Sequence, residues 1–181
     1  MTSLKPVAAA LLLGLLIAVG SAEAKDEPMK PSGALQAVMD DSVKDFFETA
    51  GSAGLFEIEA GKLAQAMGTS PEVKSFGEKM VTDHQKAADE LKEVADEKGV
   101  KLPAALLKRH QKMLDDLKDE KPGQEFDNTF RRYMIASHKE AVSLFDESAK
   151  KSADQDVKAF AAKTLPILQH HGSMAERLPK S

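Results

Sequence analysis

The fold is decided by residues 70–99, which read SPEVKSFGEKMVTDHQKAADELKEVADEKG. Ser70 is a favoured helix N-cap, and Pro71 stands at the first helical position, where its missing N–H costs nothing. Apolar residues then recur in steps of three and four, the period of an α-helix, until Gly99 ends the segment. The stripe consists of Val73, Phe76, Met80, Ala87, Leu91 and Val94. His84 lies on the same stripe, so the pattern predicts a histidine in a buried position.

Three further segments have the same helical period. They are residues 42–67, which end before Gly68, residues 125–151, and a segment that begins at a cap near Asp154. Pro166 lies inside the last segment and is expected to kink it. Each of these stripes also has one metal-capable residue: Glu57, His138 and His171. The chain has no Trp and one Tyr, and strand-type runs of Val, Ile and Thr are missing, so the predicted fold class is all-α.

The connections between the helices predict how they are arranged. Two connections are only a few residues long, which predicts two antiparallel hairpins. Residues 100–124 form a longer connection, with a short helix expected after Pro103 and ending before Pro122-Gly123. Such a segment can carry the chain back along the bundle. We therefore expect a four-helix bundle with a short extra helix and the crossover topology of ferritin-like folds, with a plain up-down bundle as the alternative.

Residues 1–24 have the pattern of a cleaved signal peptide. A lysine near the start precedes an apolar run from Val7 to Val19, and residues 22–24, Ala-Glu-Ala, form a small-x-small cleavage site. The run is too short to span a bilayer, and no second apolar run of about 18 residues follows it. We therefore expect cleavage after Ala24 and a periplasmic protein with no integral membrane segment.

The rest of the chain is predicted to have two parts: a flexible lead-in over residues 25–40, charged and rich in Pro and Gly, and one bundle domain over residues 41–181. The formal net charge is −4, which argues against nucleic acid and anionic membrane surfaces as partners. The chain has no cysteine, which excludes disulfides, thiolate chemistry and a lipid-attachment cysteine. The sequence identifies no protein partner and leaves a homodimer open.

Glu57, His84, His138 and His171 are expected to meet in one layer near the middle of the bundle. At 1.5 Å per residue, Glu57 lies about 15 Å and His84 about 20 Å from the turn that joins their helices. His138 lies about 20 Å and His171 about 26 Å from the other turn. Each pair therefore matches in height to within roughly one helical turn.

This layer predicts a metal site in which one carboxylate and three imidazoles bind Zn, Cu, Fe or Mn. Gly54 and Gly61 flank Glu57 and are expected to leave room around its carboxylate. Methionines on the same faces as the histidines would favour copper(I), although Met is also an ordinary core residue. These methionines are Met80, Met134 and Met174. Two alternatives stay open: a hydrogen-bonded polar layer in a non-enzymatic envelope module, and acid/base catalysis by a tuned Glu57.

Established catalytic motifs are missing from the sequence. Di-iron bundles use Glu-x-x-His pairs, but the residue three places before each stripe histidine is Val81, Ile135 or Leu168. The His-Glu-x-x-His helix of zinc proteases is missing as well. The sequence therefore leaves open whether the protein is an enzyme.

Four residues near the stripes have simpler interpretations. Glu59 is expected to face solvent or form a salt bridge. Asp83 cannot share the face of its neighbour His84, and its position also allows a hydrogen bond to a histidine of a neighbouring helix. His110 follows two basic residues in the long connection and is expected to be exposed. His170 neighbours His171 and is a reserve ligand.

Three stretches resemble a large bacterial family of exported proteins. They are residues 54–64 (GLFEIEAGKLA), residues 76–84 (FGEKMVTDH) and residues 165–171 (LPILQHH). The family is a domain of unknown function, often labelled as outer membrane or exported proteins, with a ferritin-like helical bundle. The resemblance covers about residues 40–178. It implies the bundle, the export and histidines at positions 84, 138 and 171, and it implies no established activity.

Overall fold

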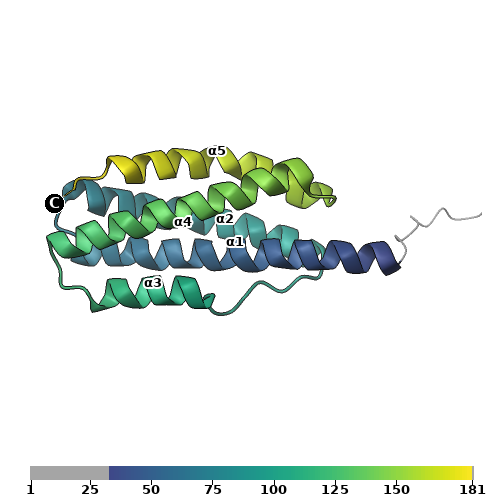
Figure 1. Ribbon diagram of the computed structural model, residues 1–181, viewed down its shortest axis with the longest axis horizontal. Helices are drawn as coiled ribbons and strands as arrows, with labels where there is room; N and C mark the ends of the chain where they lie inside the picture. The colour runs from purple at the N-terminus through teal and green to yellow at the C-terminus, as the bar shows by residue number, and fades with distance from the viewer. Residues whose placement is uncertain (1–32, 181) are drawn as a thin grey trace, which may run out of the picture. The chain divides into compact units, whose positions relative to one another are not determined.

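The computed structural model describes residues 33–180, and within this range the chain forms helices and no β-strand. The helices are α1 (Gly33–Met67), α2 (Pro71–Glu97), α3 (Lys108–Asp119), α4 (Gln124–Lys151) and α5 (Gln155–Arg177) (Figure 1). The prediction of an all-α bundle with a short helix in its long connection is confirmed. α1 begins nine residues before its predicted start at residue 42, inside the segment expected to be a lead-in. The predicted signal peptide and residues 25–32 lie outside the described residues.

The helix ends follow the local signals of the sequence. The Ser70 hydroxyl accepts hydrogen bonds from the backbone N–H groups of the second and third residues of α2, which Pro71 begins. Asp154 caps α5 in the same way. Gly99 follows the C-cap of α2, and its φ of 65° is the left-handed conformation that glycine adopts without strain. α5 continues through Pro166 as one helix. None of the described helices is long and apolar enough to cross a membrane.

Two glycines let α1 and α2 approach closely. A Cβ atom on Gly61 would lie 2.6 Å from the backbone oxygen of Gly77, and a Cβ atom on Gly77 would lie 2.7 Å from the backbone oxygen of Gly61. Gly61 therefore serves the helix contact instead of leaving room around Glu57. Gly54 is different, because a Cβ atom there would meet nothing within 4 Å. The expected space beside Glu57 exists on the Gly54 side.

Contacts at the two ends of the bundle establish its topology. At one end, Asp127 in the first turn of α4 accepts hydrogen bonds from Thr69 and Ser70 in the α1–α2 turn. At the other end, Lys98, just after α2, pairs with Asp154 in the α4–α5 turn at 2.6 Å. α2 and α4 therefore run in the same direction, and the connection that contains α3 returns along α1 (Figure 1). This is the crossover arrangement typical of ferritin-like bundles, and it excludes the plain up-down alternative.

The core has two apolar clusters with a polar layer between them. One cluster contains Phe56, Met80, Met134 and Ala175, and the other contains Ala50, Leu91, Ala141 and Leu168. Each of the four long helices contributes to both clusters. Near the boundary between the clusters, the four helices place buried polar side chains: Glu57 on α1, His84 on α2, Ser137 and His138 on α4, and His171 on α5. The bundle thus holds this layer in its interior.

Candidate metal centre

The four predicted residues meet in the bundle core. Their exposed fractions are 1% for Glu57, 4% for His84, 0% for His138 and 1% for His171. The three imidazole rings form a nearly equilateral triangle, with centroid separations of 5.5 Å (His84–His138), 5.4 Å (His84–His171) and 5.6 Å (His138–His171). The prediction that four separate helical stripes converge on one layer is therefore confirmed.

Glu57 fixes the orientation of His84. Its Oε2 lies 3.0 Å from His84 Nδ1, and its Oε1 accepts a 2.6 Å hydrogen bond from the Ser137 hydroxyl. Burial alone would raise the pKa of Glu57, but His84, His138 and the Ser137 hydroxyl outweigh burial and hold that pKa below its ordinary value. The carboxylate is therefore ionised and can only accept. His84 must donate its Nδ1–H to Glu57, which leaves the lone pair on Nε2 free.

The other two histidines are fixed by oxygen atoms in the same manner. His138 Nδ1 lies 2.9 Å from the Met134 backbone oxygen, which can only accept, so His138 carries its proton on Nδ1. His171 Nε2 lies 2.9 Å from Asp83 Oδ2, so His171 carries its proton on Nε2. Asp83 also pairs with Lys79 at 2.8 Å. Asp83 on α2 therefore hydrogen-bonds a histidine of a neighbouring helix, one of the roles that its sequence position allowed.

Three lone pairs consequently face one another inside the triangle. His84 Nε2, His138 Nε2 and His171 Nδ1 have no hydrogen-bond partner among the described residues. One nitrogen from each ring lies within 4.8 Å of the others. Burial lowers the pKa of His84, and burial together with His84 lowers the pKa of His171 to about 4, so both rings stay neutral near pH 7. Buried acceptors normally have donors. This group can hold a metal ion.

Glu57 lies outside the triangle that the three histidines form. Its carboxylate is on the protonated side of His84. Oε2 accepts from His84, and Oε1 accepts from Ser137 and lies 3.5 Å from His138 Nδ1. Glu57 thus contacts the His84 nitrogen that is turned away from the triangle, which is where metal-bound histidines usually have an oxygen partner. Ser137 was not predicted, because the sequence pattern selected one polar residue per helix and Ser137 directly precedes His138.

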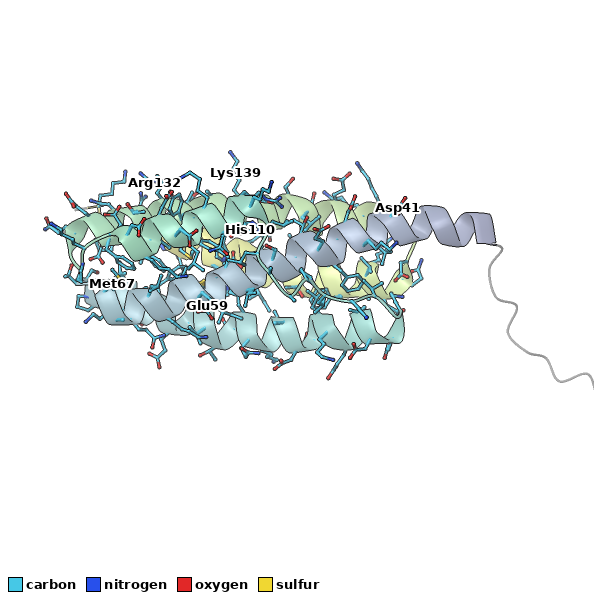
Figure 2. The ribbon with its side chains drawn as sticks, turned by 90° about the horizontal axis from the view of Figure 1, so that it is seen from below. Asp41, Glu59, Met67, His110, Arg132 and Lys139 are labelled. Atoms are coloured by element: carbon cyan, nitrogen blue, oxygen red, sulfur yellow. The ribbon has the colours of Figure 1, made fainter. Side chains whose placement is uncertain are left out.

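The prediction that His110 is exposed is wrong. His110, labelled in Figure 2, is fully buried, and its Nδ1 lies 2.7 Å from the Ser52 hydroxyl of α1. Its ring stacks on Phe56 with centroids 6.0 Å apart, and its Nε2 lies 3.5 Å from a Glu140 carboxylate oxygen. The physical reason is that α3 packs one face on α1. The basic residues before His110 occupy the outer face.

The remaining candidates lie away from the triangle. Glu59, labelled in Figure 2, pairs with Lys62 at 2.7 Å, as expected of a surface residue. His170 is exposed. Met80 and Met134 are fully buried in the apolar cluster on one side of the histidines, and Met174 packs against that cluster. They have the packing of core residues, and the copper(I) hypothesis stays a prediction.

Comparison with known proteins identifies the family to which the chain belongs and no individual relative. A family model described as "Domain of unknown function (DUF4142)" matches residues 28–178. No curated protein and no solved structure matches the chain. The geometry of the site is thus the main source of information on what the protein does.

Proposed function

Because the chain belongs to the DUF4142 family, whose description names no activity, we propose from the geometry of the histidine layer that the protein binds one transition-metal ion. The ligand atoms are His84 Nε2, His138 Nε2 and His171 Nδ1. One observation carries the proposal: a nitrogen from each of the three rings lies within 4.8 Å of the others, and each ring has one buried nitrogen without a partner while its second nitrogen contacts an oxygen. Each ring thus has its proton directed away from the centre and its lone pair available.

The ligand set favours zinc(II) or copper(II). Neutral imidazole suits both ions, whereas manganese prefers sites with carboxylate or water oxygens. Three protein ligands are also typical of zinc sites that keep a fourth position for water or a substrate, and structural zinc sites use four. Glu57 and Asp83 lie near enough to balance the charge of a bound cation. They also make the imidazoles of His84 and His171 more basic through their hydrogen bonds.

A purely structural polar layer is the competing hypothesis. It needs a donor for each inner nitrogen, either an N–H of another ring or a buried water molecule. The hydrogen bonds favour the metal hypothesis, since Glu57, Met134 and Asp83 each receive the one proton that a neutral ring has. No N–H is left to point inward.

We also propose that the protein acts outside the cytoplasm, in the periplasm. The support is the apolar run and small-x-small site in residues 1–24. In that compartment, a site made only of imidazole nitrogens has no thiolate that could be oxidised.

The test is metal analysis of the protein purified without chelators, followed by calorimetric titration of chelator-treated protein with zinc(II), copper(II), iron(II) and manganese(II). We expect uptake of about one equivalent of zinc or copper, which His138→Ala abolishes. His170→Ala is the matched control, because His170 is an exposed histidine on α5. Failure to take up any of the four ions, or unchanged binding by His138→Ala, would overturn the proposal.

A further inference from the structure

A cavity of about 270 Å³ lies beside the histidine layer. It opens between α1 and α2 and reaches inward to Glu57 and His84. Its wall is mainly apolar and includes Ala53, Leu91, Phe145 and Leu168. An apolar cavity of about 150 Å³ is enough to hold benzene. This cavity therefore has room for a somewhat larger molecule.

Gly54 keeps the cavity open. A Cβ atom at Gly54 would meet nothing within 4 Å, although the residue lies in the middle of a long helix. Its φ is not positive, so the backbone does not require glycine there. Glycine weakens a helix interior relative to alanine. Unlike Gly61 and Gly77, which permit helix contact, Gly54 has the effect of leaving space in the wall of the cavity.

The two ends of the cavity differ in chemistry. At the mouth, Glu59 and Lys62 form an ion pair, so the entrance selects neither sign of charge. At the inner end, Glu57 is an ionised carboxylate with about four acceptor positions, and its close hydrogen bonds come from Ser137 and His84. An occupant can therefore place a hydrogen-bond donor at Glu57 and its apolar body against the wall.

We propose that this cavity binds a small neutral molecule with a largely apolar body and one N–H or O–H donor, of the size of indole or a substituted phenol. The ligand lies next to Glu57 and His84, on the side of the His84 ring that faces away from the metal position proposed above. The cavity does not depend on that metal, so the two proposals fail separately.

The test uses indole as the probe with chelator-treated protein. The chain has no Trp, so indole fluorescence can be followed directly in addition to calorimetry. We expect a Kd on the order of 1 mM or tighter, and a several-fold higher Kd for benzofuran, which has nearly the same shape and no donor. Gly54→Leu fills the cavity and should weaken indole binding by about tenfold or more. Ala66→Leu, at an exposed position of the same helix, is the control.

The outcomes separate the alternatives. Loss of indole binding in Gly54→Leu, with helix content and metal uptake unchanged, supports the proposal. If Gly54→Leu fails to fold, Gly54→Ala gives the same comparison with a smaller expected loss. The proposal is overturned if the parent protein does not bind indole, if Gly54→Leu binds it as well as the parent, or if Ala66→Leu is equally impaired. Equal affinity for benzofuran would overturn the role of Glu57 as the acceptor.

Discussion

Replacing Glu57 with Gln tests whether this residue is a metal ligand or the partner that orients His84. In the structure, Glu57 Oε2 accepts from His84 Nδ1 at 3.0 Å, and Oε1 accepts from Ser137 at 2.6 Å. Gln has the same shape but one acceptor oxygen and no charge, so it can keep only one of these bonds. His84 becomes less basic and less well oriented, while its Nε2 and the other two ligand atoms stay in place.

The expected loss of metal affinity is moderate. Removing the oxygen partner of a metal-bound histidine typically weakens binding about 10- to 100-fold, which corresponds to about 1.4–2.7 kcal/mol. In the metal-free protein, a charge-assisted bond contributes about 1.5–3 kcal/mol and a neutral one about 0.5–1.5 kcal/mol. The free energy of unfolding should therefore fall by about 1–2 kcal/mol, and Tm by about 3–6 °C.

Calorimetric metal titration and thermal unfolding of the same samples provide the measurement. Glu59→Gln is the matched control, because Glu59 lies two residues away on α1 and pairs with Lys62 on the surface. It should change neither metal affinity nor stability by a measurable amount. Complete loss of metal binding in Glu57→Gln would show that Glu57 is a ligand. Unchanged affinity would show that its contact with His84 has no role in metal binding, and either result would refute the assignment.

Three further predictions concern the metal-free protein. Gly54→Ala should raise the free energy of unfolding by about 0.5–1 kcal/mol. Gly77→Ala should lower it, because the new Cβ would lie 2.7 Å from Ala64 Cβ. Denaturant unfolding of both variants tests these two signs. The pKa of His171 is 6.5 in the unfolded chain and about 4 in the folded protein. Between these values the unfolded chain binds the proton and the folded protein does not, so the free energy of unfolding should fall as the pH falls below 6.5. The loss should reach about 3 kcal/mol by pH 4. Unfolding at pH 7.5 and 4.5 tests the sign, and a protein equally stable at both values would contradict it. His110→Ala should lower the free energy of unfolding by about 2–4 kcal/mol, because it opens a cavity and removes the contact with Ser52. A change below about 0.5 kcal/mol would show that His110 does not stabilise the packing of α3 on α1.

The helices and the convergence of the site could be predicted because they depend on local and periodic properties. Ser70, Pro71 and Asp154 determine helix starts through their own backbone and side-chain chemistry. The rise of 1.5 Å per residue then fixes the heights of Glu57 and His84 relative to the turn between their helices. Neither step requires knowledge of which side chains touch across the bundle.

The roles of the converging residues could not be predicted, because they depend on contacts between helices. Glu57 and His84 lie on separate helices, and only their relative rotation determines that the carboxylate meets Nδ1 instead of the centre of the triangle. The burial of His110 also depends on a contact between helices, which the sequence pattern does not show. His110, Leu114 and Leu117 are all buried and have helical spacing, so the signal was present, but the basic residues beside His110 suggested an exposed segment.

The two apolar clusters explain how the histidine layer can keep its geometry without a bound metal. Each long helix packs into both clusters, so the backbone around the layer is held from two sides without any contribution from the histidines. Within the layer, the proton of each ring is fixed by a carboxylate or a carbonyl oxygen on its outer side. The three inner lone pairs are therefore oriented by groups that a bound ion would not displace. In small zinc domains the metal supplies the folding free energy, but here the bundle supplies it. Metal binding would add stability that grows with the logarithm of the free metal concentration. Such a preorganised site loses little conformational freedom on binding. The histidines are consequently better explained as a binding device than as a source of stability, because three unpaired buried nitrogens weaken the bundle that contains them.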